Sequence, residues 1–133
     1  MPQRRALILD ADPRICRLIG RIVEGIGIAS LLIDKSSSFK VRYKQFEPDI
    51  IFLDMDLERP QVSAIELLQY LADKNSTVEI ILMTCVNKSE MAVEDRDGRP
   101  FNLNFSGCLT KPISVDDFKS KLAEILKKPE LEQ

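Results

Sequence analysis

Acidic side chains, a hydroxyl and a lysine follow the short apolar runs of this 133-residue sequence. Each stands at or just beyond the point where an apolar run ends: Asp10, Asp12, Asp54, Asp56, Thr84 and Lys111. Carboxylates held close together repel and raise one another's pKa, so such a cluster needs a cation to stay ionised near neutral pH. An oxygen-ligated divalent metal and the Lys111 amine would both supply positive charge. Because Mg²⁺ typically bridges a protein acid to a phosphate oxygen, the combination suits phosphoryl transfer to a carboxylate.

Histidine and cysteine usage limits the chemistry further. The chain has no histidine, which removes the commonest general base, the commonest zinc ligand and any phosphohistidine relay within the chain. Cys16, Cys85 and Cys108 are odd in number, far apart and set among apolar neighbours, whereas disulfide frameworks and zinc sites need closely spaced pairs. We expect buried thiols that fill the core.

The composition is that of an ordinary folded domain and narrows the choice of partners. Hydrophobic residues make up 44% and charged residues 30% of the chain, with a net charge of -2. Lysine and arginine are scattered along the sequence, so we expect no contact with nucleic acid. The first apolar run meets Asp10 after a few residues, far short of a signal or membrane-spanning segment. We therefore expect a cytoplasmic domain without a membrane anchor.

Short apolar runs predict the strands that would position the polar groups. They lack the polar alternation of a half-exposed strand, so both faces of the sheet should be covered. The predicted strands are Ala6–Leu9, Ala29–Ile33, Ile50–Leu53, Ile80–Met83 and, on a shorter signal, Cys108–Leu109. In an open parallel sheet, ligands bind outside the carboxyl ends of the strands, which is where the acidic residues stand.

Apolar residues at helical spacing alternate with these strands. The first helix is predicted to begin at Pro13, with Asp12 as its cap, and to stop at Gly25 or Gly27. Three further helices are predicted over Phe39–Phe46, over Ala64–Leu71 after Ser63, and from Val115 to Leu126 behind a Ser114–Asp117 capping box. This alternation predicts an α/β domain with a doubly wound parallel sheet and helices on both faces.

One segment departs from the pattern. Met91 to Phe105 carries a charged run with Gly98 and Pro100, which cannot continue an amphipathic helix. We expect a short or irregular fourth helix there, followed by a mobile loop. The domain itself is expected to span residues 1–128, and residues 129–133 to form a polar tail or the start of a linker.

Four motifs in order, ALILDADP, DIIFLDMD, IILMT and LTKPI, resemble the receiver domain of two-component response regulators. Each motif alone is weak, but their combination at successive strand ends is specific and covers nearly the whole chain. The resemblance implies a five-stranded sheet in the order 2-1-3-4-5. It also implies a histidine kinase or phosphotransfer protein as the phosphoryl donor.

The same resemblance implies a role for each site residue. Asp54 would be the phosphoacceptor, Thr84 the hydroxyl that turns toward the phosphate, and Lys111 its ion partner before a cis Pro112. The expected Mg²⁺ ligands are Asp10, Asp12, Asp54 and the backbone carbonyl of Asp56. The Asp56 side chain is expected to face solvent. Such a domain is a binding module that catalyses only its own phosphorylation and dephosphorylation.

The sequence also departs from the family pattern. Ala11 stands where the family usually has a second consecutive acid, which weakens the expected metal site. Asp12 either swings inward to coordinate the metal or only caps the helix that begins at Pro13. Cys108 replaces the usual aromatic switch residue, and the interval from Thr84 to Lys111 is longer than usual. The loop at Leu57–Ala64 is also longer.

Other functions compete with a phosphorylatable receiver. Taken singly, Asp54 and Thr84 are polar residues that end strands, and Lys111 is a solvated charge; only their combination favours function. A degenerate receiver could act as a phosphorylation-independent interaction or homodimerisation module. The LDAD or LDMD motif could belong to a haloacid-dehalogenase-like phosphatase, although the chain is short for one. A flavodoxin is disfavoured because acids occupy its phosphate loop.

Overall fold

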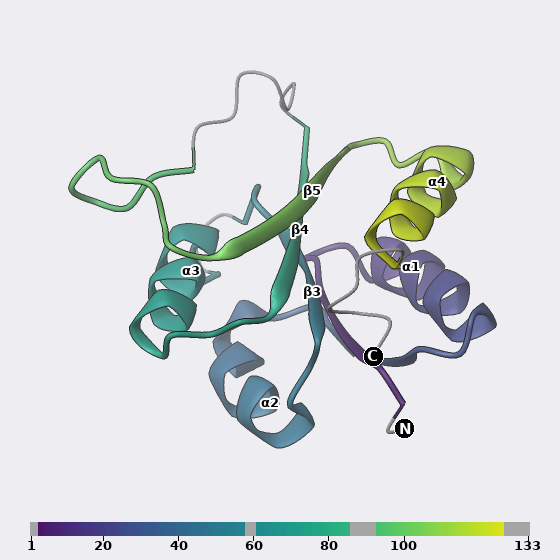
Figure 1. The fold of residues 1–133 in the computed structure, drawn as a ribbon, viewed down its shortest axis with the longest axis horizontal. Helices are drawn as coiled ribbons and strands as arrows, with labels where there is room; N and C mark the ends of the chain where they lie inside the picture. Colours follow the sequence, from purple (N-terminus) through teal and green to yellow (C-terminus); the bar gives the residue numbers. More distant parts are fainter. Residues whose placement is uncertain (1–2, 58–60, 86–92, 127–133) are drawn as a thin grey trace.

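Five parallel strands form one sheet in the order β2-β1-β3-β4-β5 (Figure 1). The computed structural model describes residues 3–57, 61–85 and 93–126. Its strands are β1 (Arg5–Leu9), β2 (Ala29–Ile33), β3 (Ile50–Asp54), β4 (Glu79–Thr84) and β5 (Asn104–Thr110). The predicted doubly wound sheet and its strand order are confirmed. The chain winds outward in both directions from β1 and β3, and ligand sites of such sheets lie at this switch point.

Alternate residues of the central strands enter two separate cores. In β3, Ile50 and Phe52 belong to one cluster of buried side chains, whereas Ile51 and Leu53 belong to the other. Successive side chains of a strand point to opposite faces, so a strand covered on both faces must be apolar throughout. The first face is covered by α1 (Pro13–Gly25) and α4 (Val115–Leu126), and the second by α2 (Phe39–Phe46) and α3 (Ala64–Asp73) (Figure 1).

The predicted helix caps are present. Each cap side chain accepts a hydrogen bond from a backbone amide of the first turn: Asp12 from Arg14 at 2.9 Å, Ser63 from Glu66 at 3.3 Å, and Ser114 from Asp117 at 3.3 Å. Helix α1 ends at Gly25, and Gly27 then turns the chain with a φ of 87°, which glycine adopts without steric cost. A short 3₁₀ turn, η1 (Ser36–Ser38), leads into α2. Among the described residues no helix has the length and apolar content to cross a membrane.

The segment before β5 differs from the prediction. No helix occurs in residues 93–103; instead, Glu94 and Pro100 form an antiparallel bridge around a turn. The Asp95 carboxylate accepts hydrogen bonds from the amides of Asp97 and Arg99, both at 2.9 Å. Short acidic side chains compete with helix formation in this way, because they satisfy nearby amides in a turn. The part of the predicted helix at residues 91 and 92 lies outside the described residues, as does the predicted tail at 129–133.

The last strand is longer than its sequence signal. β5 begins at Asn104, whereas only Cys108–Leu109 was predicted, because Asn104, Ser106 and Gly107 are polar or small and interrupt the apolar run. Its pairing with β4 shifts register between Ile80 and Ile81.

The cysteines also correct the prediction: Cys16 is buried and Cys108 half-buried, but Cys85 is exposed at the end of β4. Burial raises the pKa of the Cys16 thiol to about 11.

Candidate functional site

Parallel register brings the polar strand ends together at one edge of the sheet. Asp54 ends β3 opposite Met83, and Thr84 ends β4 opposite Thr110, directly before Lys111. The Lys111 amide donates to the Thr84 carbonyl oxygen at 2.8 Å, which extends the ladder by one residue. Asp10 follows β1, and its amide bonds to the Ile33 carbonyl at 3.2 Å. These side chains therefore lie together because their strands end at the same level.

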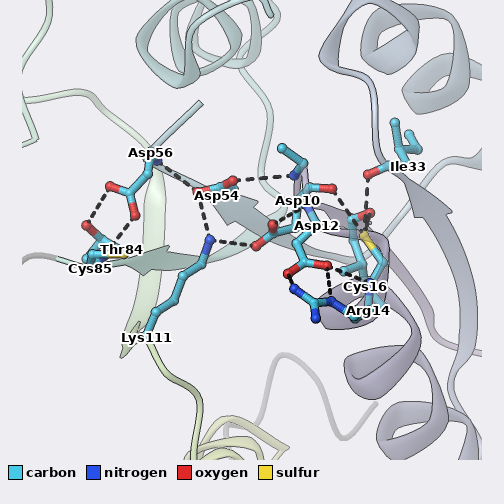
Figure 2. Close-up of polar contacts among 12 residues, drawn as sticks. Asp10, Asp12, Arg14, Cys16, Ile33, Asp54, Asp56, Thr84, Cys85 and Lys111 are labelled. Carbon is cyan, nitrogen blue, oxygen red and sulfur yellow. Dashed lines mark hydrogen bonds and ion pairs between the residues drawn. The ribbon is translucent and has the colours of Figure 1, made fainter. Parts of the chain in front are cut away.

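The Lys111 amine lies between two buried carboxylates (Figure 2). Its Nζ is 2.8 Å from Asp10 Oδ2 and 3.1 Å from Asp54 Oδ1. The side chains of Asp10, Asp54 and Lys111 are 2%, 4% and 13% exposed. Because water is largely excluded, each charge depends on its neighbours for stabilisation. These three charged groups therefore belong to the pocket interior, in contrast to a surface ion pair.

The two oxygens of Asp54 have different surroundings. Oδ1 accepts hydrogen bonds from the Lys111 amine at 3.1 Å and from the Asp56 amide at 2.8 Å. Oδ2 accepts only a long hydrogen bond, from the Ala11 amide at 3.5 Å, among the described residues. Hydrogen bonds weaken as they lengthen, so Oδ2 is the Asp54 oxygen that the described residues engage less.

Burial disfavours the charged form of the Asp10 carboxyl. It therefore raises the pKa of this group, and the effect outweighs the lowering by Lys111 and by the hydrogen bond from the Asp12 amide. Oδ1 accepts that amide at 2.8 Å. Oδ2 is buried and lies beside the Lys111 amine, yet it has no well-aligned hydrogen bond. The contact with Lys111 is therefore electrostatic, and Oδ2 retains capacity for a further positive partner.

Lys111 stays protonated despite its burial. Burial alone would lower the pKa of its amine, but the close contacts with the carboxylates of Asp10 and Asp54 together outweigh it and raise the pKa. The following peptide bond, Lys111–Pro112, is cis as predicted. The amine therefore remains a fixed positive charge beside Asp54 at neutral pH.

Of the two alternatives for Asp12, metal coordination or helix capping, the structure shows helix capping. The Asp12 carboxylate accepts the Arg14 amide and is also bound by the Arg14 guanidinium, at 3.1 Å from Nε and 3.0 Å from Nη2. These hydrogen bonds lower the pKa of the Asp12 carboxyl. The side chain is thus engaged at the start of α1, apart from the Lys111 contacts (Figure 2).

Asp56 corrects the prediction of a side chain that faces solvent. Its carboxylate is half-buried and accepts hydrogen bonds from the Thr84 hydroxyl at 3.1 Å and from the Cys85 amide at 2.8 Å (Figure 2). The Thr84 hydroxyl is therefore engaged by a carboxylate, and the sequence reasoning missed the Cys85 amide. The contact follows from topology and not from a local pattern, because the pairing of β3 with β4 places an acid two residues beyond β3 beside a hydroxyl at the end of β4.

The donor set suits a magnesium ion held by few protein ligands. Across residues 3–57, 61–85 and 93–126, no three acidic, histidine or cysteine side chains converge as a metal cluster. Mg²⁺, however, usually keeps several waters and takes one or two carboxylates. Asp10 and Asp54 provide these, and the buried Asp10 Oδ2 lacks an aligned donor. The residues present therefore fit such an ion.

The buried carboxylates and the lysine lie at the carboxyl edge of a doubly wound α/β sheet, which is where ligands bind in this class of protein. The model of the response regulator receiver domain matches residues 6–123. This chain belongs to the response regulator receiver domain family of two-component signalling. Receiver domains of this family are generally signalling modules that bind Mg²⁺ and interact with histidine kinases or phosphotransfer proteins.

Curated proteins and solved structures agree with this assignment. The chain is 21% identical over 125 residues to the chemotaxis protein CheY of Treponema pallidum, with 92% of this chain and 83% of that protein covered. It is 32% identical over 94 residues to a protein-glutamate methylesterase/protein-glutamine glutaminase of Treponema denticola, with 66% of this chain and 24% of that protein covered.

Structural likeness extends over almost the whole chain. A receiver domain protein from Methanospirillum hungatei superposes with a TM-score of 0.77 at 20% identity, covering 99% of this chain and 100% of that one. CheY4 of Vibrio cholerae gives a TM-score of 0.76 at 14% identity, covering 94% of this chain and 100% of that one. At these identities the likeness establishes the fold, and the chemistry depends on the residues of this chain.

Proposed function

We propose that this receiver domain accepts a phosphoryl group on Asp54 from a phosphohistidine donor and thereby changes its protein-binding surface. The observation that carries the proposal is the position of the Lys111 amine, 3.1 Å from Asp54 and 2.8 Å from Asp10 inside a largely dry pocket. An ammonium fixed there neutralises an incoming phosphoryl group and needs no rearrangement to do so. The donor would be a histidine kinase or a phosphotransfer protein, because the chain has no histidine of its own.

The reaction is an in-line displacement. Asp54 Oδ2 attacks phosphorus, an oxygen–phosphorus bond forms, and the phosphorus–nitrogen bond of the donor breaks with its electron pair leaving on the imidazole nitrogen. Lys111 offsets the negative charge on the transferred group. Hydrolysis of the resulting aspartyl phosphate by water returns the domain to its first state. The domain therefore catalyses only its own phosphorylation and dephosphorylation.

Asp10, Asp54 and the backbone carbonyl of Asp56 would hold the magnesium ion. When bound, Mg²⁺ supplies positive charge opposite the phosphoryl oxygens. Asp12 would join this set only by leaving Arg14, to which it is bound by three hydrogen bonds. Ala11 offers no carboxylate in its place. We therefore expect weaker metal binding than two consecutive acids would give.

A degenerate receiver is the second candidate, and the engagement of the Thr84 hydroxyl by Asp56 favours it. If that contact never opens, the domain serves only as an interaction or homodimerisation surface. Amide spectra recorded by NMR with Mg²⁺ and beryllofluoride, a phosphoryl analogue, separate the two. Phosphoacceptance predicts shifts around Asp54 and Lys111 that vanish in Asp54→Asn. Unchanged spectra at saturating Mg²⁺ and beryllofluoride, in the wild type and in an Asp56→Ala variant alike, would refute it.

A further inference from the structure

The Asp56 side chain lies between Asp54, the proposed phosphoacceptor, and the end of β4. The Asp56 carboxylate accepts the Thr84 hydroxyl through Oδ1 at 3.1 Å and the Cys85 amide through Oδ2 at 2.8 Å. Both donors come from consecutive residues at the strand that neighbours Asp54. A carboxylate that accepts from two adjacent donors occupies a small anion-recognition site.

Asp56 is also tied to Asp54 through its backbone. The Asp56 amide donates to Asp54 Oδ1 at 2.8 Å, the oxygen that also contacts Lys111. This contact and the two side-chain contacts fix the position of Asp56 at both ends. The side chain is half-buried, so its charge is only partly screened from a group added to Asp54.

A phosphoryl group and the Asp56 carboxylate would compete for the same donors. The two are like-charged, so they repel when close. The Thr84 hydroxyl has one proton and can donate it to only one acceptor at a time. Occupation by Asp56 and donation to a phosphoryl oxygen therefore exclude each other.

We infer that Asp56 is a positioning residue that holds Thr84 and Cys85 in the resting arrangement and must release both before a phosphoryl group on Asp54 can use them. The inference rests on the proposed function and adds to it an autoinhibitory contact, here called the Asp56 latch, formed by Asp56, Thr84 and Cys85. The latch opposes phosphorylation, and phosphorylation opens the latch.

The latch is first tested in the resting protein, without any phosphoryl analogue. Cys85 is exposed, so protection of its amide against hydrogen exchange depends on the hydrogen bond to Asp56. Asp56→Ala should therefore accelerate exchange at Cys85 about tenfold or more, and Asp56→Asn, which keeps an acceptor oxygen, should have a smaller effect. Unchanged exchange at Cys85 in Asp56→Ala would overturn the latch.

The second test measures the apparent beryllofluoride affinity at saturating Mg²⁺ by NMR. Loss of the latch should tighten binding about tenfold in Asp56→Ala, because charge-assisted hydrogen bonds no longer need to be broken, and by less in Asp56→Asn. Asp34→Asn is the matched charge control, since Asp34 follows β2 on the far side of β1 and β3 from β4. It should leave the affinity near that of the wild type.

A double-mutant cycle separates the hydrogen bond from simple charge. If Asp56 acts through the hydroxyl, the gain from Asp56→Ala should shrink in a Thr84→Ala background. An equal gain in both backgrounds, or the same gain in Asp34→Asn, would overturn the latch in favour of a field effect.

The outcomes also separate this inference from the proposed function. Beryllofluoride binding by the wild type with no gain in Asp56→Ala refutes the latch and leaves phosphoacceptance standing. Binding by neither protein refutes phosphoacceptance and the latch with it. If beryllofluoride binds Asp56→Ala but not the wild type, both phosphoacceptance and the latch are supported, because the latch of the wild type is then too stable for the analogue to open. Thermal unfolding of each variant verifies that it is folded.

Discussion

Replacing Lys111 by methionine removes the charge that two buried carboxylates share. Methionine keeps an apolar stem of similar length, so the change tests charge more than packing. The amine lies 2.8 Å from Asp10 Oδ2 and 3.1 Å from Asp54 Oδ1, and the lysine side chain is 13% exposed. Breaking a buried pair typically costs about 3–5 kcal/mol because it leaves an uncompensated charge. The residual exposure of the pocket reduces this, and we expect a loss of about 2–4 kcal/mol in the free energy of unfolding at pH 7.

The pKa of Asp10 determines how the stability penalty of Lys111→Met changes with pH. The folded-state pKa of Asp10 is raised above its ordinary value of 3.8, so folding favours the protonated carboxyl. The free energy of unfolding therefore falls as pH rises from 3.8 through the raised pKa. Without Lys111 this pKa rises further, so the penalty of Lys111→Met should be largest near neutral pH and should shrink toward pH 4.

Urea denaturation at a series of pH values measures the penalty directly. Asp10→Asn is the matched second variant, because it removes one of the two charges that the missing amine leaves unpaired. In the Lys111→Met background it should restore part of the lost stability. A penalty below about 1 kcal/mol, typical of an exposed ion pair, would refute this account of the pocket. A penalty that does not change between pH 7 and pH 4 would do the same.

Three further changes test other parts of the structure. Asp12→Ala removes a helix cap and should lower the midpoint of urea denaturation without changing Mg²⁺ affinity; a clear loss of that affinity in a metal titration would show that Asp12 turns inward. Phe118→Ala should cost about 3–5 kcal/mol in urea denaturation, because Phe118 is fully buried and stacks on Phe52 with ring centroids 5.5 Å apart; a cost below 1 kcal/mol would contradict this packing. The Asp56 carboxylate accepts a hydrogen bond from the Cys85 thiol, which raises the pKa of that thiol. Asp56→Asn should therefore speed alkylation of Cys85 at neutral pH, measured by mass spectrometry of the labelled peptide. An unchanged rate would mean that the contact is absent in solution.

The central sheet could be predicted because its signals are local. The run Ile50–Leu53 is apolar on both faces, and only a strand covered on both sides tolerates that pattern. The start of α1 was equally plain, because Asp12 and Pro13 satisfy the first turn from adjacent positions. Parallel strands that end together then imply the meeting of Asp54 and Lys111. That contact follows from topology, although the residues are far apart in sequence.

The remaining features depend on contacts between distant segments. Asn104 to Gly107 carry little strand signal and become part of β5 by pairing with β4. The turn around Asp95 depends on one carboxylate that finds amides at two positions. The Asp56 side chain finds its donors on β4, which is distant in the sequence. No local pattern around Asp56 therefore distinguished the latch from a solvated acid.

The most direct test of the account is to locate a transferred phosphoryl group. The protein is incubated with acetyl phosphate and Mg²⁺, and the modified residue is identified by mass spectrometry of its peptides. We predict one phosphoryl group on Asp54, no incorporation in Asp54→Asn, and slower incorporation in Lys111→Met. Equal incorporation in Asp54→Asn, or none in the wild type and in Asp56→Ala alike, would contradict the claim that this pocket directs a phosphoryl group to Asp54.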